Sequence, residues 1–164
     1  MSITIDTLRR NLHTKRFKYS TTKYPFKKVL TDLYGIDLEE LHLALGSFEL
    51  FNTTEGYYRE QSTLAHKVFY KNFNKEFSSI YDQFMKEVIA KIVNYEFHYQ
   101  KIPTFRVGLP GNLFIKEFHK DSDYNHQQYE VNFNVGLSNF LGDAALLAEE
   151  SPGSNNYVLL ECPH

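Results

Sequence analysis

The residues with the clearest capacity for metal chemistry lie in a short acidic segment of the C-terminal half. His119 and Asp121 stand two positions apart, close behind an alternating, strand-like segment. On a strand this spacing sends both side chains to one face, so an imidazole nitrogen and a carboxylate oxygen can bind one metal ion from adjacent corners. Such a pair supplies two of the three ligands in the facial triad of two histidines and one carboxylate that holds Fe(II). A His-x-Asp triplet also arises by chance, and the alternative is a polar loop after a strand.

A β-rich C-terminal part would position this pair. Alternation of apolar and polar residues predicts four short strands, at 104–109, 113–119, 129–137 and 157–161. Pro110, Gly111 and Asn112 predict a turn between the first two strands.

The N-terminal part is predicted to be helical. Pro25 can open a helix that Gly35 ends, and Asp37 with Glu40 three residues later predicts the start of a second short helix. A segment without clear period, 46–58, is predicted to be a loop. Helices followed by a run of strands indicate an α+β fold.

Two longer helices are predicted from apolar residues that recur every four positions. The first should start near Glu60, and the second near Ser78 or Ser79, ending around Tyr95. The apolar residues of these stripes are Phe69, Phe73, Phe77, Ile80, Phe84, Val88 and Ile92.

Composition places the chain in the range of one globular domain, with 164 residues of which 42% are hydrophobic. We expect a single domain, 1–164, with a mainly helical part (1–99) and a β part (100–164). Cys162 is the one cysteine, so a metal must use histidine and carboxylate ligands. Because no apolar run approaches the roughly 20 residues of a membrane span, we expect a cytoplasmic protein without a membrane partner.

Charge is segregated along the chain: residues 1–28 hold eight Lys and Arg against one Asp, whereas residues 117–161 hold eight acids against one Lys. The basic segment carries Phe17, Tyr19, Tyr24 and Phe26, which could stack on nucleic-acid bases. Alternatively, these rings dock on the protein while the lysines stay in water. A third reading is attraction to an acidic partner, such as the chain's own C-terminal surface. The acidic C-terminal half argues against nucleic acid.

Three stretches around the metal pair resemble a known family. Segments 101–112, 117–124 and 130–133 are similar to the Fe(II)/2-oxoglutarate-dependent oxygenases, in particular the streptomycin-biosynthesis or carbohydrate-cluster type, and the resemblance extends over roughly 100–153. It implies a double-stranded β-helix, a cupin-like jelly roll, with the N-terminal helices packed on its outer sheet.

The resemblance also implies roles for individual residues. His119 and Asp121 would bind Fe(II), while Arg106, Asn132 and Asn134 would face the cavity that holds 2-oxoglutarate. Strand alternation supports these directions independently, because all three polar residues take the parity opposite to the apolar side chains. The site residues named are Arg106, His119, Asp121, Tyr124, Asn132 and Asn134, with Tyr124 at the cavity entrance.

Each of the polar residues has a structural alternative. Arg106 could pair with Glu117 or Glu130 across the sheet, and the two asparagines could satisfy neighbouring backbone groups. His126 is predicted to be a loop residue rather than a ligand.

The reaction implied by the resemblance is hydroxylation of a small molecule, a sugar or aminocyclitol-type metabolite, coupled to decarboxylation of 2-oxoglutarate to succinate. A complete jelly roll needs about eight strands, and the segment from Ile102 onward has room for about half of them. The family's second metal-binding histidine and its basic carboxylate-binding residue lie on later strands, and His164, beside the chain end, is a poor substitute.

The alternative function is therefore that of a truncated, non-catalytic cupin-like binding or assembly protein. Half a barrel would expose strand edges that carry Val131, Phe133 and Val158, and this predicts self-association into a homodimer.

Overall fold

The chain folds as two compact units, Tyr19–Pro110 and Met1–Lys18 with Gly111–His164. The structure is a computed structural model that describes residues 4–44, 63–108, 126–127 and 129–164. These boundaries differ from those of the predicted parts, 1–99 and 100–164. Residues 1–18 belong to the same unit as residues 111–164. The single domain stays a prediction. No helix in the described ranges is long and apolar enough to cross a membrane.

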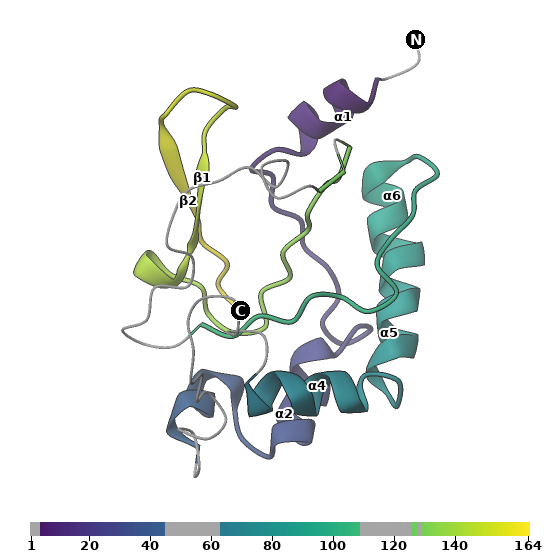
Figure 1. Cartoon of the computed structure of the whole chain (residues 1–164), viewed down its shortest axis with the longest axis vertical. Helices are drawn as coiled ribbons and strands as arrows, with labels where there is room; N and C mark the ends of the chain where they lie inside the picture. Colours follow the sequence, from purple (N-terminus) through teal and green to yellow (C-terminus); the bar gives the residue numbers. More distant parts are fainter. Residues whose placement is uncertain (1–3, 45–62, 109–125, 128) are drawn as a thin grey trace. The chain divides into compact units, whose positions relative to one another are not determined.

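The unit Tyr19–Pro110 is helical in its described part, and Figure 1 shows its α5 and α6 as one continuous rod. Its elements are α2 (Phe26–Tyr34), a 3-10 helix (Leu38–Leu43), α4 (Leu64–Asn72), α5 (Phe77–Phe84), a π-helical turn (Met85–Ile89) and α6 (Ala90–Val93).

The two short helices near the N-terminus are confirmed. Gly35 ends α2 with a left-handed φ of 70°, and its N–H donates to the carbonyl of Thr31. Asp37 accepts a hydrogen bond from the backbone N–H of Glu39 at 3.0 Å, which caps the 3-10 helix.

Both longer helices are present, and the second starts near the predicted position, but the predicted capping role of Ser78 and Ser79 was wrong. α5 begins at Phe77, so Ser78 and Ser79 lie inside the helix rather than capping it. The Ser78 N–H instead donates to the carbonyl of Phe73 at 3.0 Å, and across this turn the rings of Phe73 and Phe77 lie 5.8 Å apart. At the other end, Asn94 in a left-handed conformation stops α6 after Val93, near the predicted Tyr95. The predicted start near Glu60 and the loop 46–58 lie outside the described residues.

An aromatic core holds these helices together. The Phe69 ring lies 5.3 Å from that of Phe77 and 5.9 Å from that of Phe73, both tilted toward edge-to-face geometry. Farther along, Phe84 contacts Tyr24 at 5.4 Å and Phe26 at 5.2 Å, again edge to face. The first predicted stripe is therefore buried at Phe69, Phe73 and Phe77. In the second, Phe84 is buried but Ile80, Val88 and Ile92 are only half-buried. The buried apolar residues of this unit are Tyr24, Phe26, Leu30, Leu41, Ala65, Phe69, Phe73, Phe77, Tyr81, Phe84, Ile89 and Val93.

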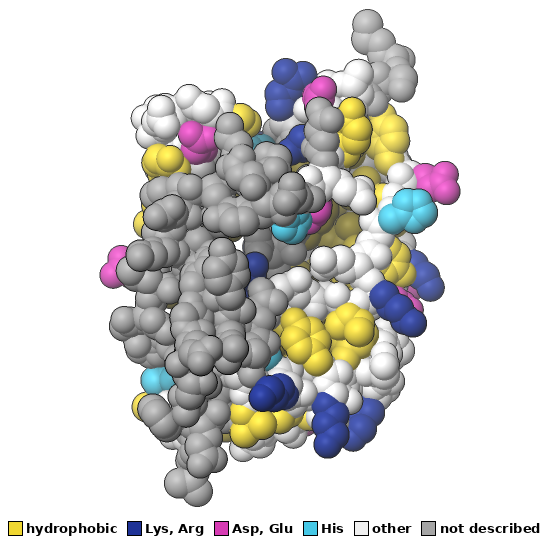
Figure 2. Space-filling view, in the orientation of Figure 1, with side chains coloured by type: hydrophobic (Ala, Val, Ile, Leu, Met, Phe, Trp, Pro, Cys, Tyr) yellow, Lys and Arg dark blue, Asp and Glu magenta, His cyan; other side chains and the backbone are white. Residues whose placement is uncertain are grey.

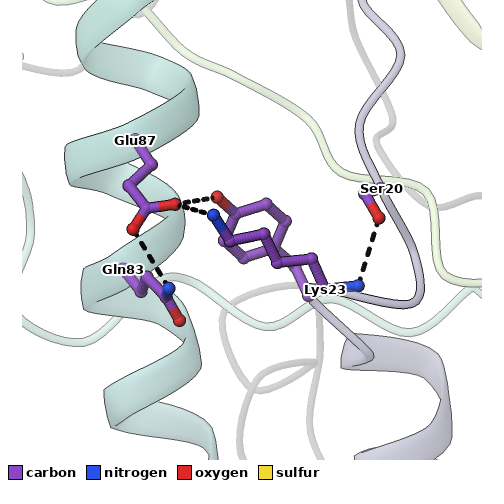
Figure 3. A network of polar contacts seen from close by, with 5 residues as sticks. Ser20, Lys23, Gln83 and Glu87 are labelled. Carbon is purple, nitrogen blue, oxygen red and sulfur yellow. Dashed lines mark hydrogen bonds and ion pairs between the residues drawn. The ribbon is translucent and has the colours of Figure 1, made fainter.

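Hydrogen bonds and an ion pair join the segment before α2 to the π-helical turn (Figure 3). Glu87 accepts a hydrogen bond from the Tyr24 hydroxyl at 2.6 Å and forms an ion pair with Lys23. Its other carboxylate oxygen accepts from the Gln83 side chain at 3.0 Å. These donors, Lys23 first, lower the pKa of Glu87 to about 2. Glu87 therefore stays ionised and bound over the whole neutral and mildly acidic range.

The aromatic residues of the basic segment divide into two groups. Tyr24 and Phe26 are 3% exposed, so their rings are unavailable for base stacking, whereas Phe17 is 45% exposed. Tyr19 packs against Phe84 with ring centroids 5.2 Å apart. In the space-filling view, Lys and Arg side chains stand at the surface among hydrophobic ones (Figure 2).

The second unit contains α1 (Ile5–Leu12) and an antiparallel pair, β1 (Leu146–Glu149) with β2 (Tyr157–Leu160). A 3-10 turn, Gly142–Ala144, precedes β1, and a single bridge between Phe140 and Cys162 extends the ladder. His13 donates from its Nε2 to the carbonyl of Glu149 at 2.7 Å, and Arg16 donates to that of Leu159 at 3.2 Å. The basic N-terminal segment therefore binds the hairpin through backbone carbonyls.

Strand prediction was partly right. β2 confirms the strand expected at 157–161, whereas β1 and α1 were not predicted. Residues 104–108 and 131–136 are not assigned to strands, although Phe105, Val107, Val131 and Phe133 are half-buried and the polar residues between them exposed.

The alternation ends at Gly136, which approaches Cys162 so closely that an added Cβ would lie 2.8 Å from its sulfur. Val135, the residue before it, is 36% exposed, against the predicted parity. The strand expected at 113–119 and the turn at 110–112 lie outside the described residues, and the jelly roll stays a prediction.

Removal of the central ring tests this core. We expect Phe69→Ala to lower the free energy of unfolding by about 3–5 kcal/mol, because the ring is 2% exposed and its neighbours cannot fill the cavity. Urea unfolding followed by circular dichroism measures the change. The control Leu43→Ala, at a side chain 69% exposed, should cost less than about 0.5 kcal/mol, and equal losses in both variants would contradict the assigned core.

Candidate functional site

The predicted metal ligands His119 and Asp121, with Tyr124, lie outside the described residues. Within the described ranges, no three His, Cys, Asp or Glu side chains converge in a way that could hold a metal ion. Fe(II) and 2-oxoglutarate therefore stay predictions that rest on the sequence.

The three remaining site residues are described, and the structure distributes them over both units. Arg106 belongs to the helical unit, while Asn132 and Asn134 belong to the other. All three are exposed. Arg106 and Asn132 lie between half-buried neighbours, whereas Asn134 is followed by the exposed Val135. Their roles in a cavity stay predictions.

The best-defined of these positions is Arg106, because the residue before it is tightly held by α4. The Phe105 ring stacks on Phe69, with centroids 4.4 Å apart and planes at 19°, and lies edge-on to His66 at 5.7 Å. On its other side it stacks at longer range on Tyr34, at 6.5 Å. The backbone N–H of Phe105 donates to the Tyr70 hydroxyl at 3.1 Å. Phe105 is thus fixed in both ring and backbone, although the segment has no regular secondary structure.

Beside this anchor lies His66, a buried histidine that the sequence analysis did not single out. It is 2% exposed, and its Nδ1 is hydrogen-bonded to the Thr63 hydroxyl at 2.6 Å. Burial, and then the positive charge of Arg106, lower the pKa of His66 below its ordinary value of 6.5. The ring is therefore neutral at neutral pH. A Thr-x-x-His spacing at the start of an apolar stripe is the signal that could have found it.

A half-buried tyrosine also contacts α4. The Tyr34 hydroxyl donates to the carbonyl of Ala65 at 2.7 Å, and burial raises its pKa well above the ordinary value. This hydroxyl thus remains protonated and ties α2 to α4.

The histidines that follow Asp121 in the sequence are His126 and His164. His126 lies in a loop, as predicted, and its Nδ1 is 3.1 Å from both carboxylate oxygens of Glu130. His164 has an exposed side chain, and its backbone N–H donates to Asn139 at 2.9 Å.

The burial of His66 predicts a pH dependence of stability. Its pKa is lower in the folded chain than in the unfolded one, so the unfolded chain takes up a proton first as the pH falls. This contribution is complete above about pH 6.5 and is lost as the pH drops below it, by at most about 1.4 kcal/mol per pH unit. Urea unfolding at pH 7.5 and 5.5 measures it. In His66→Asn, which keeps a hydrogen-bonding group for Thr63, the acid-induced loss should be smaller; the same loss as in the wild type would contradict the assignment.

Comparison with known proteins identifies a relative with a named role. The streptomycin biosynthesis protein StrG of Streptomyces griseus is 30% identical to this chain over 142 residues, which cover 87% of this chain and 67% of StrG. No family model matches the chain. No solved structure matches it. Because the similarity extends over most of both proteins, this chain belongs to the family of the streptomycin biosynthesis protein StrG.

Proposed function

We propose that this chain is an Fe(II)/2-oxoglutarate-dependent oxygenase-like protein that hydroxylates a sugar or aminocyclitol-type metabolite in a biosynthetic pathway. The observation that carries the proposal is the pair His119 and Asp121, set at strand spacing between two alternating segments. Membership in the family of a streptomycin biosynthesis protein supports the biosynthetic role.

The donor chemistry of the pair suits Fe(II), which binds imidazole and carboxylate ligands in a facial arrangement. Bound there, iron and 2-oxoglutarate would supply the oxidising chemistry that hydroxylation of an unactivated carbon requires. The double-stranded β-helix is part of the same proposal, because its strand ends would present such ligands to a central cavity.

The chain's own polar residues would bind and orient the small molecules. Arg106 can offer two parallel N–H donors to a carboxylate, and the side-chain amides of Asn132 and Asn134 can both donate and accept. Each of the three is on the exposed parity of its segment, which supports access from solvent. Tyr124 is proposed at the entrance to the cavity.

A second candidate function is non-catalytic binding or assembly, with the cupin-like cavity retained. It is favoured by the contacts of the two described histidines that follow Asp121, since the His126 ring is hydrogen-bonded to Glu130 and the His164 backbone donates to Asn139. In a homodimer, which stays a prediction, a neighbouring copy could supply the missing ligand.

An anaerobic titration with Fe(II) in the presence of 2-oxoglutarate tests the proposal. We expect a visible charge-transfer band that saturates near one iron per chain, because the keto acid chelates iron that His119 and Asp121 hold. In His119→Ala the band should disappear. The control His42→Ala changes a histidine outside the proposed site and should keep the band.

Either result decides between the two functions. A saturable band that requires His119 favours the oxygenase over the non-catalytic candidate. It also shows that the third ligand comes from this chain or from a second copy. A folded wild-type protein without any band would reject the oxygenase and leave the non-catalytic candidate.

A further inference from the structure

We propose that His13 and Arg16 of the basic N-terminal segment cap the two outer edges of the β1–β2 hairpin and so prevent edge-to-edge pairing with a second copy of this chain. All of these contacts lie within one unit, Met1–Lys18 with Gly111–His164. The inference goes beyond the proposed function and does not depend on a metal or an acid. It bears on the predicted homodimer, because it names two strand edges that are closed to self-association.

The pairing pattern of the hairpin shows where its outer edges lie. The Glu150 N–H donates to the carbonyl of Asn156 at 2.7 Å. Hydrogen-bonded and non-hydrogen-bonded pairs alternate along an antiparallel ladder, which makes the pairs that contain Glu149 and Leu159 non-hydrogen-bonded. Backbone groups in such pairs point away from the partner strand. The carbonyl of Glu149 therefore belongs to the outer edge of β1, and that of Leu159 to the outer edge of β2.

One short segment supplies a donor to each of these two carbonyls. His13 donates from Nε2 to the carbonyl of Glu149 at 2.7 Å, and the Arg16 guanidinium donates to that of Leu159 at 3.2 Å. Figure 1 shows the chain leaving α1 beside the hairpin. A strand added to either edge would use the same carbonyl as an acceptor, so the segment and the added strand compete for it. Charged side chains and covering loops at strand edges are the means by which natural sheets oppose such addition.

The sequence of β2 suits pairing with itself, and this makes a second copy the competitor. In an antiparallel pairing centred on Val158, Tyr157 of one copy would lie opposite Leu159 of the other. Apolar or aromatic side chains would meet at each position, and no like charges would oppose each other. Tyr157 and Leu159 are 40% and 44% exposed, so both side chains are accessible from solution. The Leu159 carbonyl that Arg16 binds would then accept the N–H of Tyr157 of the second copy.

The gain from such pairing is the gain of a larger sheet. A two-stranded hairpin is marginally stable in water, whereas three or more strands with an apolar face form a stable unit. Pairing of two hairpins through β2 would give four strands. The two side-chain donors therefore protect the part of this unit that has most to gain from association.

Substitution of both caps tests the inference. The double variant His13→Ala with Arg16→Ala should self-associate about 10-fold or more tightly than the wild type, because pairing no longer requires that hydrogen bonds to the caps be broken in each chain. Size-exclusion chromatography with light scattering over a concentration series measures the dissociation constant. Circular dichroism and thermal unfolding establish that each variant is folded.

Two control variants separate the hydrogen bonds from the charge. His13→Gln with Arg16→Lys keeps a donor at each position and should leave association at the level of the wild type. Lys18→Ala removes the same charge as Arg16→Ala, from an exposed side chain two residues farther along. It should also leave association unchanged.

A change on the strand itself separates edge pairing from other kinds of association. Leu159→Lys places a charge at the exposed position that would face Tyr157 of the second copy, and charged edge residues oppose strand addition. Added to the variant without caps, it should return association to the level of the wild type. Oligomers that form through general unfolding would persist.

Three outcomes overturn the inference. The first is equal association of the wild type and the variant without caps. The second is an equal gain in Lys18→Ala, which would assign the effect to net charge. The third is an oligomer that Leu159→Lys does not dissociate, because its contact would then lie outside the β2 edge.

Discussion

The helical unit depends on the burial of the Phe69 ring. This ring stacks on Phe105 and packs edge-on against Phe77 across the turn from α4 to α5. It therefore contacts both the neighbouring helix and a segment without regular secondary structure. Aromatic rings bury large apolar areas and hold defined geometries, so a core built from them can order an irregular chain segment without a sheet ladder.

Tyrosine hydroxyls add hydrogen bonds to the contacts made by the aromatic rings. A tyrosine ring that enters the core carries a hydroxyl that must find a partner, and three of these hydroxyls form hydrogen bonds between a helix and an irregular segment. Tyr24 donates to Glu87, Tyr81 donates to the carbonyl of Gln100, and Tyr70 accepts from Phe105. The same residues thus provide hydrophobic burial and hold the connecting segments against the helices. Arg106 owes its defined position to this arrangement.

Local patterns predicted much of the helical unit and less of the other. The glycine at position 35 is a local signal that was confirmed, and so was the apolar period at Phe69, Phe73 and Phe77. In the next helix the buried face shifted by one residue to Tyr81, Ile89 and Val93. Ser78 and Ser79 were misjudged because capping preference is weaker than the need to bury Phe77. β1 was missed because Leu146–Glu149 lacks alternation, and its strand conformation depends on pairing with β2.

The sequence by itself determined the two-residue spacing of His119 and Asp121, the apolar periods of the helices and the alternation in the segments that carry Arg106, Asn132 and Asn134. These features follow from residue type and short spacing. Only the tertiary structure decided that Phe105, the residue before Arg106, packs against the buried His66 and that the N-terminal segment binds the hairpin. The contacts responsible join residues 35 positions apart, Tyr70 and Phe105, and 136 apart, His13 and Glu149. Contacts between residues so far apart produce no periodic pattern in the sequence, because they depend on how whole secondary-structure elements pack together.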